Sequence, residues 1–329
     1  MKATLLFGLL ALITSNSAAA GGYHVTDRIV GPDGGWDYAS YDTLRDRVLV
    51  ARGAAVNAFD LKTHKVNPSL APAAWGHAAF ALPGGAEVLI TNGSKANATF
   101  VDATTGALIA TVATGLAPDD AIVDPKSGLL LVMNHAGGSI TLIDLTAHAA
   151  VATIPVGGTL EAAAVDGEGR AFVNVEDKNQ IAVIDIGKRE VVARYALPGC
   201  EGPTGIAYAA SEKLLISACD GIAEVVAAET GKVVDQIKIG DGADGVAYDP
   251  TRHLAFVPAG KSGTLSVISI RKGRAKLLET VPTQRGARTL AIDVKGGRVF
   301  LPTAKYGVAT GNGRPPVIPG TFELLVVGK

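Results

Sequence analysis

Aromatic residues make up only 5% of this 329-residue chain, although apolar residues make up 48%. A core of ordinary size must therefore be built from Val, Ile, Leu and Ala rather than from large rings. Methionine and tryptophan are also scarce, with two of each, whereas glycine occurs 40 times. This composition is typical of many short strands joined by turns, and it argues against long helices.

Long hydrophobic runs are missing after residue 20, so we expect no membrane span. Before that point, Lys2 precedes an apolar run from Ala3 to Ile13, and the small residues "SAAA" fit cleavage after Ala20. The pattern predicts a secretory signal peptide over residues 1–20 and a single domain over residues 21–329, with a short membrane anchor as the alternative. We therefore expect a periplasmic or secreted protein.

An excess of charge of either sign is absent as well. Removing Lys2 from the 30 basic residues leaves 29 against 31 acidic residues, a net charge of −2. Such a chain offers no basic surface to the phosphate backbone, so nucleic acid is not an expected partner.

Motifs that carry well-known chemistry are also missing. The chain has no G-x-S-x-G, H-E-x-x-H, P-loop or Rossmann glycine pattern, so serine-based hydrolysis and nucleotide binding are unsupported. Its two cysteines, Cys200 and Cys219, do not form a C-x-x-C motif, which argues against a redox role. In an exported chain they predict one disulfide, with two free thiols as the alternative.

What the chain does have is a repeat of forty-odd residues. A polar residue, a short apolar run, an Asp-containing turn, a second apolar run, a glycine-rich loop and an alternating strand recur, as in "DAIVDPKSGLLLVMNHAGGSITLID" from Asp120. Steps of 40, 43, 41, 43, 40 and 44 residues separate the polar residues that open seven such repeats. These residues are Asp37, His77, Asp120, Glu161, Thr204, Asp244 and Arg288.

Each repeat contains four apolar runs of about five residues, rich in Val, Ile and Thr and separated by turn signals. Four antiparallel strands in this length are typical of a propeller blade, and the apolar spacing of three and four that a helical solenoid needs is missing. The last repeat stops after its third strand, while "YHVTDRIVG" near the N-terminus matches a fourth strand. The sequence thus predicts an all-β, seven-bladed β-propeller whose N-terminal strand completes the last blade and removes exposed edges.

The repeat resembles that of the YVTN-type, YncE-like seven-bladed propellers exported by bacteria, over essentially the whole chain after residue 20. The WD40 signature is absent. The resemblance implies the fold and an exported protein, but it does not by itself imply an activity. It is carried by "GWDY" (35–38), "NVEDK" (174–178), "GCEGPTGIAY" (199–208), "QRGARTLAID" (284–293), "LPTAKYG" (301–307) and "PGTFELLVVG" near the C-terminus.

Two classes of aspartate recur at turns, where an Asp side chain accepts hydrogen bonds from backbone N–H groups, so we interpret both as structural. The class after the first strand is Asp42, Asp124, Asp166, Asp249 and Asp293, and the class that ends the third strand is Asp60, Asp102, Asp144 and Asp185. Asp119, one step before Asp120, is expected in a loop and solvated.

The seven residues that open the repeats form a third class. The first strand of a propeller blade lines the central channel, so each should place one polar side chain at the channel mouth. The second strand ends at the same mouth and should contribute Asn134 and His135. This predicts a concave polar pocket, the usual place for a binding site. Arg288 falls between Asp244 and Asp37 in the closed ring and is expected to pair with one of them.

His77, Asp120 and Glu161 lie on three consecutive blades, where an imidazole and two carboxylates could bind a divalent metal ion or do acid–base work. Ordered water held by the ring is the simpler alternative. Two functions follow. The first is a monomeric, non-catalytic binding or scaffold protein that takes a small molecule, ion or protein partner at the mouth. The alternative is a metal-dependent propeller enzyme of the lyase or lactonase type.

The last blade carries a long second-to-third strand loop, "AKYGVATGNGRPPVIPG" over residues 304–320. A Pro- and Gly-rich insertion of this length is usually functional or disordered, and we expect a lid or rim contact over the mouth. Lys305, Tyr306 and Arg314 of this loop could line the pocket. Trp36 and Trp75, close to Asp37 and His77 in the sequence, could line it as well, or could instead pack between blades.

Overall fold

The computed structural model of the protein describes residues 21–308 and 315–329. The predicted signal peptide over residues 1–20 and Arg314 of the long loop lie outside these residues. Within them, the only helical elements are two short 3-10 turns, η1 (Gly93–Lys95) and η2 (Glu176–Lys178). No helix in this part of the chain has the length and apolar character to cross a membrane.

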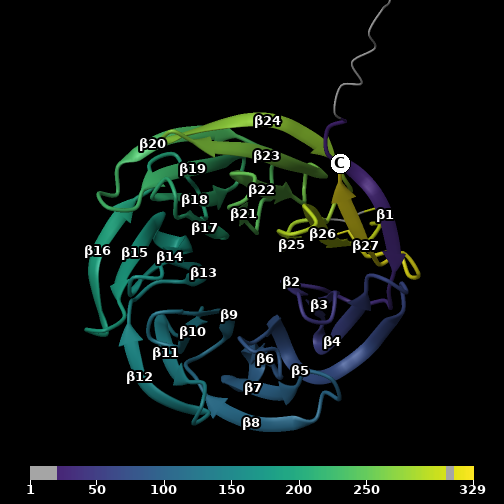
Figure 1. The fold of residues 1–329 in the computed structure, drawn as a ribbon, viewed down its shortest axis with the longest axis horizontal. Coiled ribbons are helices and arrows are strands. Elements are labelled where there is room, and N and C mark those ends of the chain that lie inside the picture. The colour runs from purple at the N-terminus through teal and green to yellow at the C-terminus, as the bar shows by residue number, and fades with distance from the viewer. Residues whose placement is uncertain (1–20, 309–314) are drawn as a thin grey trace, which may run out of the picture.

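The strands form a closed ring of seven blades, each of four antiparallel strands, which confirms the predicted fold class (Figure 1). The innermost strands are β2 (Ala39–Asp42), the second half of β5 (Val66–Ala81), β9 (Pro118–Val123), β13 (Leu160–Val165), β17 (Ile206–Ala209), β21 (Ala247–Asp249) and β25 (Ala291–Asp293). The second strands are β3 (Arg47–Ala51), β6 (Glu87–Asn92), β10 (Leu129–Asn134), β14 (Arg170–Val175), β18 (Leu214–Cys219), β22 (Leu254–Ala259) and β26 (Arg298–Thr303).

The outer half of each blade completes the ring. The third strands are β4 (Gly53–Asp60), β7 (Asn97–Asp102), β11 (Ser139–Asp144), β15 (Gln180–Asp185), β19 (Ile222–Ala227), β23 (Thr264–Arg271) and β27 (Glu323–Gly328). The outermost strands are the first half of β5, β8 (Leu108–Ala113), β12 (Ala149–Pro155), β16 (Glu190–Ala196), β20 (Val233–Lys238), β24 (Arg274–Pro282) and β1 (His24–Val30).

Strand β5 belongs to two blades. Its first half pairs with β4 as the outermost strand of blade 1, and its second half pairs with β6 as the innermost strand of blade 2. Blades 1 and 2 are therefore one continuous seven-stranded sheet, whereas the other five blades are separate four-stranded sheets.

The two ends of the propeller close on each other as the sequence predicts. β1 pairs antiparallel with β27, from His24 opposite Gly328 to Val30 opposite Glu323. Ile29 of β1 is only 3% exposed and packs in the cluster that includes Phe59 and Phe322. The N-terminal strand is thus both hydrogen-bonded and packed into blade 7.

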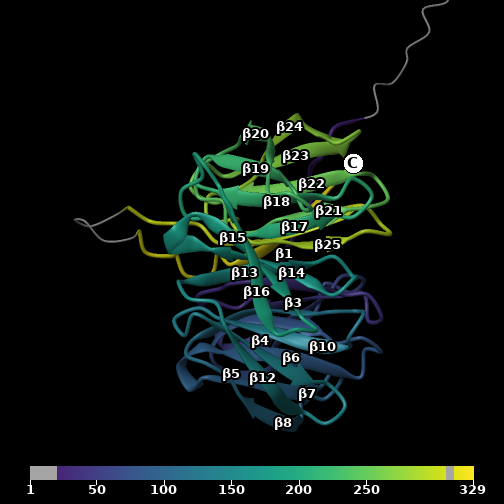
Figure 2. The ribbon, with the colours of Figure 1, turned by 90° about the vertical axis from the view of Figure 1, so that its left-hand side faces the viewer.

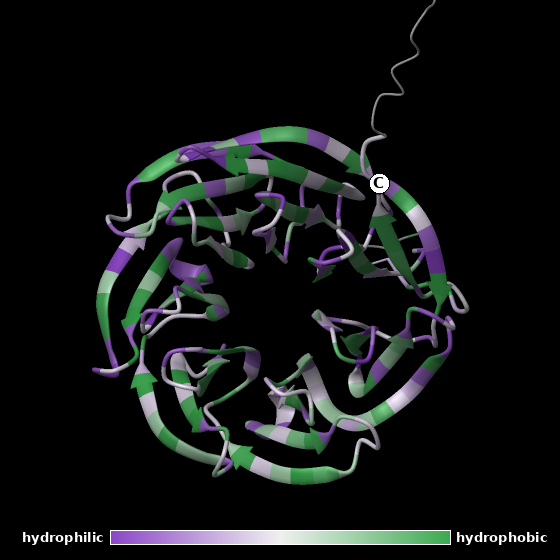
Figure 3. Cartoon of the chain, viewed as in Figure 1, coloured by the Kyte–Doolittle hydropathy of each residue, from purple (hydrophilic) through white to green (hydrophobic). Residues whose placement is uncertain are grey.

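The burial of each strand follows from its place in the blade. The second and third strands of a blade are covered on both faces by neighbouring blades, so they are buried almost throughout, as in β10 and β11. The outermost strand has one face toward a neighbour and one toward solvent, so β16 alternates between exposed and half-buried residues. Figure 3 shows this alternation of green with purple and white around the rim.

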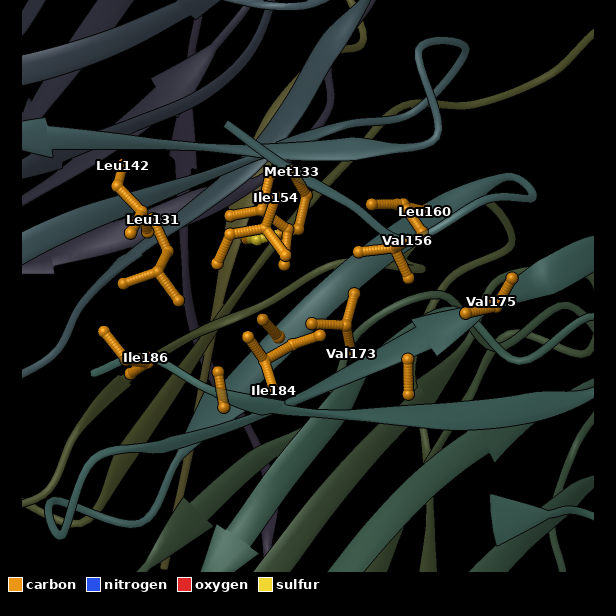
Figure 4. Close-up of a cluster of buried hydrophobic side chains, with 14 residues drawn as sticks. Leu131, Met133, Leu142, Ile154, Val156, Leu160, Val173, Val175, Ile184 and Ile186 are labelled. Carbon is orange, nitrogen blue, oxygen red and sulfur yellow. The ribbon is translucent and has the colours of Figure 1, made fainter. Parts of the chain in front are cut away.

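Apolar side chains fill the wedges between blades. Between blades 3 and 4, Leu131 and Met133 of β10 meet Val173 and Val175 of β14 in one buried cluster (Figure 4). Burying a side chain of this size contributes about 1.5–3 kcal/mol. Repeating such wedges around the ring gives the core without long helices or many aromatic rings.

The two recurrent classes of aspartate form the expected turns. Asp124 is fully buried and its carboxylate accepts hydrogen bonds from the Ser127 N–H at 2.9 Å and the Ser127 hydroxyl at 2.7 Å. In the second class, Oδ1 of Asp144 accepts from the N–H groups of Thr146 and Ala147 at 2.8 and 2.9 Å. Their structural role is confirmed.

Cys200 and Cys219 form the predicted disulfide, with their Cα atoms 5.3 Å apart. The bond ties the loop before blade 5 to the end of β18, and both cysteines are buried.

Candidate binding site at the channel mouth

Strand register defines which residues share the ring at the channel mouth. In blade 2, Gly76 pairs with Asn92 and Ala79 with Ile90, so His77 and the next residue bulge together opposite one residue of β6. In blade 3, Pro118 pairs with Asn134 and Ala121 with Val132, which leaves Asp119 and Asp120 in the same bulge. The residue equivalent to His77 is therefore Asp119.

The prediction that Asp120 belongs to this ring is corrected by one residue. Asp119 lies in β9, is only 9% exposed and lines the mouth, whereas Asp120 faces the channel below it. The expectation that Asp119 would be solvated in a loop is also wrong. A slip of one residue along a strand turns a side chain to a different face. The sequence carries a signal for the correct register, because Asp119 lies five residues before the turn aspartate Asp124, as Glu161 lies five residues before Asp166.

His77 lies between carboxylates from the two neighbouring blades. Its Nδ1 atom is 2.6 Å from Oδ2 of Asp37 and 3.0 Å from Oδ1 of Asp119. Burial alone would lower the pKa of His77, but the hydrogen bonds to Asp119 and Asp37 outweigh it and raise the pKa to about 10. His77 is therefore an imidazolium at neutral pH.

Arg288 makes the matching contacts on the other side of Asp37. Its Nε donates to Oδ2 of Asp244 at 2.6 Å, and its Nη2 donates to Oδ1 of Asp37 at 3.3 Å and to the Trp36 carbonyl at 3.1 Å. Arg288 was expected to pair with one of the two aspartates, and it pairs with both. Burial raises the pKa of Asp244 to about 6, although the charge of Arg288 opposes the shift.

A second histidine pair lies on blades 3 and 4. The Nδ1 atom of His135 is 3.0 Å from Oε1 of Glu161 and 3.2 Å from the Leu160 carbonyl. The hydrogen bond to Glu161 raises the pKa of His135 to about 8. Burial raises the pKa of Glu161 to about 7, and its bond to His135 only partly offsets this. Glu176, in η2, completes a group with these two that the sequence did not suggest.

These side chains surround a cavity of about 190 Å³ at the mouth. A larger cavity of about 860 Å³ adjoins it over blades 5 to 7 and shares Asp244 and Arg288 with it. The residues that line the smaller cavity are Asp37, Tyr38, His77, Ala117, Asp119, His135, Glu161, Asp244 and Arg288.

Two solved structures share this architecture. A chain in a crystal structure of the mitotic checkpoint complex superposes with a TM-score of 0.75 at 13% identity, covering 98% of both chains. Hydrazine synthase of Kuenenia stuttgartiensis superposes with a TM-score of 0.71 at 16% identity, covering 83% of this chain and 94% of that one. The chain is a β-propeller. Identities this low show the fold alone.

Comparison of the sequence adds no closer identification, because no family model matches the chain and no curated protein matches it.

Two further residues expected at the mouth lie elsewhere. Asn134 is fully buried. Its Oδ1 accepts a hydrogen bond from the Gly115 N–H at 3.0 Å, and its Nδ2 donates to the Thr141 hydroxyl at 3.0 Å. Thr204 lines the larger cavity and not the smaller one. The amide of Asn134 thus supports the blade rather than facing the cavity.

The described parts of the long loop border the larger cavity. Tyr306 and Pro315 line it, and an isolated bridge pairs Tyr306 with Val317. The flanking yellow segments extend beyond the rest of this face in Figure 2. Trp36 packs between blades against Phe322, with ring centroids 5.3 Å apart. Trp75 is 69% exposed and has a left-handed backbone (φ 55°), which is unusual for a bulky residue.

The predicted metal set of His77, Asp120 and Glu161 is not brought together. Among the described residues, two other groups have donor atoms within 4.8 Å of one another: Asp37 with His77 and Asp119, and His135 with Glu161 and Glu176. A transition metal such as zinc lies about 2.0–2.2 Å from each donor, which keeps the donors roughly 3 Å or more apart. The 2.6 Å contact of His77 with Asp37 instead fits a shared proton. The second group fits a metal better.

Proposed function

We propose that this propeller is an exported binding protein whose mouth holds the cationic head group of a small organic ligand. The observation that carries the proposal is the shortage of positive charge around the smaller cavity. Four carboxylates, of Asp37, Asp119, Glu161 and Asp244, line it with one arginine and two histidines. A fifth carboxylate, Asp120, lies directly below.

Two acids near the mouth have raised pKa values, chiefly because they are buried. Burial raises the pKa of Glu161 to about 7, and repulsion from Asp119 adds to that shift. Burial also raises the pKa of Asp120 to about 7, again with Asp119 contributing. A cation placed in the cavity would favour the ionised carboxylates and relieve both effects.

The sizes of the two cavities point to the class of ligand. Sites for whole organic molecules occupy about 300–1,000 Å³. The mouth cavity, at about 190 Å³, suits one head group such as an ammonium or guanidinium. The adjoining cavity of about 860 Å³ can hold the rest of the molecule, and its Arg285 is exposed and makes no side-chain hydrogen bond or ion pair with the described residues.

Isothermal titration with ethylammonium and guanidinium tests the proposal. For ligands this small the ceiling is about 1.5 kcal/mol per heavy atom, so affinities near millimolar are expected. Affinity should rise from pH 5.5 to pH 8, because Glu161 and Asp120 lose their protons in that window. Binding below pH 8 should release protons to the buffer.

Glu161→Gln is the matched test of the site. A charge-assisted hydrogen bond contributes about 1.5–3 kcal/mol, so this variant should bind at least tenfold more weakly. Glu229→Gln, on an outer surface beside Arg170, should bind like the wild type. Binding that is independent of pH, or unaffected by Glu161→Gln, would contradict the proposal.

The finer assignment to the exported YncE-like, YVTN-type propellers belongs to this proposal. It is supported by the seven-bladed fold and by the repeat itself. The disulfide supports an extracellular or periplasmic place, because disulfides persist in oxidising compartments. Cleavage after Ala20, read by N-terminal sequencing of the exported protein, would test the predicted signal peptide.

A metal-dependent enzyme of the lyase or lactonase type is the second candidate, favoured by the group of His135, Glu161 and Glu176. These residues could hold a divalent metal, which would supply Lewis-acid chemistry at the mouth. Metal analysis of protein purified without chelators separates the two candidates. Stoichiometric metal that disappears in His135→Ala supports the enzyme, and its absence leaves the binding protein.

A further inference from the structure

The mouth cavity has a counterpart deeper in the propeller. A second cavity of about 650 Å³ occupies the channel toward the opposite face, where it reaches the turns at Pro125 and Pro250. Its walls are formed mostly by small and apolar residues, and Asp120, Asp166, Tyr208 and Tyr248 also line it. Of the residues that line these two cavities, Tyr38 alone lines both.

Tyr38 stands at a level of the channel where the other blades carry small side chains. The ring position is followed in each blade by one residue that points lower into the channel, and register places Tyr38 in this set, opposite the end of β3. Its equivalents are Ala78, Asp120, Ala162, Gly205, Gly245 and Thr289. One aromatic ring therefore stands at a position where four of the other six blades carry only Ala or Gly.

The side chain of Tyr38 lies at the boundary between the two cavities, because it lines both. Burial raises its pKa well above the usual value, and the charges of Asp119, Asp244 and Glu161 add to the shift. These carboxylates belong to blades 3, 6 and 4. The hydroxyl makes no hydrogen bond to any residue within 21–308 or 315–329.

We propose that the Tyr38 ring is the floor of the mouth site and sets its depth, so that a cationic head group rests on it and the tail of the ligand must leave outward. This inference rests on the proposed function of the mouth. The face of a tyrosine ring attracts cations, and the free hydroxyl can accept an N–H from an ammonium group. Below the floor, the apolar channel would favour an alkyl chain if one could enter.

A chain-length series tests the depth of the site. Butylammonium, hexylammonium and octylammonium are titrated into the wild type, Tyr38→Ala and Tyr38→Phe. Each CH₂ that enters the apolar channel should strengthen binding about fourfold, the factor that corresponds to about 0.8 kcal/mol. This gain is expected in Tyr38→Ala only. The wild type and Tyr38→Phe should change less than twofold per CH₂, and Tyr38→Phe should bind all three more weakly than the wild type.

Equal dependence on chain length in the wild type and Tyr38→Ala would overturn the inference. Tyr208→Ala is the matched control, because Tyr208 lines only the lower cavity. It enlarges that cavity without joining it to the mouth and should show the wild-type pattern. Alanine already occupies the equivalent position in blades 2 and 4, so Tyr38→Ala is expected to fold.

A crystal structure of Tyr38→Ala soaked with neutral 1-octanol tests, without any cation, whether Tyr38 closes the channel below the mouth. An octanol chain that passes the level of residue 38 supports the inference, and two cavities that remain separate overturn it. If no ammonium ion binds any variant while octanol threads the channel, the proposed function fails and the floor stands.

Discussion

The Nδ1 atom of His77 lies 2.6 Å from Oδ2 of Asp37 and 3.0 Å from Oδ1 of Asp119. One imidazolium N–H thus serves two carboxylates, and the three residues come from three consecutive blades. The contact joins blades 1, 2 and 3 at the channel, far from the apolar wedges that join them further out.

His77→Ala should destabilise the fold, because it removes a donor from the carboxylates of Asp37 and Asp119, both of which are at least partly buried. We expect the free energy of unfolding at pH 7 to fall by about 1–3 kcal/mol in urea denaturation. His64→Ala, which removes an exposed pair with Asp27, should cost less than about 1 kcal/mol.

The loss in His77→Ala should depend on pH with a definite sign. The pKa of His77 is raised to about 10 in the fold, above its ordinary value of 6.5. Its contribution is therefore complete below pH 6.5 and is lost as the pH rises through 10. The gap between the wild type and His77→Ala should narrow from pH 7 to pH 10.5, and a constant gap would contradict a shared proton.

His135 should titrate above the usual range of a histidine. Its hydrogen bond with Glu161 raises its pKa to about 8, so the Cε1–H resonance in NMR should have its midpoint near that pH. Glu161→Gln removes the negative partner and should lower the midpoint by at least one pH unit. Glu229→Gln should leave it unchanged. A wild-type midpoint at 6.5 or below would show that the pair does not form in solution.

Closure of the ring should depend on one face of β1. Ile29 is 3% exposed in the wedge beside blade 1, and its neighbour Val30 is 68% exposed. Ile29→Ala should lower the free energy of unfolding by about 2–4 kcal/mol, the range for a buried Ile, in chemical denaturation. Val30→Ala, one position away on the solvent face, should change it by less than about 0.5 kcal/mol. Equal effects would mean that β1 is not packed in this register.

The disulfide should contribute substantially to stability. In the chain-entropy model, a closed loop with a separation of 19 residues stabilises the fold by about 3 kcal/mol. The double variant Cys200→Ser, Cys219→Ser should unfold at correspondingly lower urea. A reductant should shift the wild type toward the variant and leave the variant unchanged, and any shift in the variant would point to another cause.

The fold could be predicted because the turn residues, the strand-length apolar runs and the length of the repeat all indicate it. Turn aspartates such as Asp124 and Asp144 recur at fixed places, and the apolar runs between them have strand length. The incomplete last repeat and the strand-like segment from His24 to Val30 together require closure. These features can be recognised from local chemistry and from residue spacing, without knowing in which direction each side chain points.

The site was harder to predict because it depends on direction. The bulge in β9 decides that Asp119 and not Asp120 joins His77 and Glu161. Two sequence signals agree with this: His77, Asp119 and Glu161 follow one another at steps of 42 residues, and Asp119 and Glu161 each lie five residues before the turn aspartate of their blade. Glu176 reaches the group through η2, a turn without a sequence signature. Tyr38 could have been noticed as the large residue at a position where most repeats carry Ala or Gly.

The pairing of β1 with β27 also sets an order of events during synthesis. Residues 24–30 leave the ribosome about 300 residues before their partner, residues 323–328. At about 5–20 residues per second, this strand waits roughly 15–60 s before it can pair. Through that interval blade 7 is incomplete and the nascent propeller carries an open seam. The wait ends only with the last strand that the chain supplies.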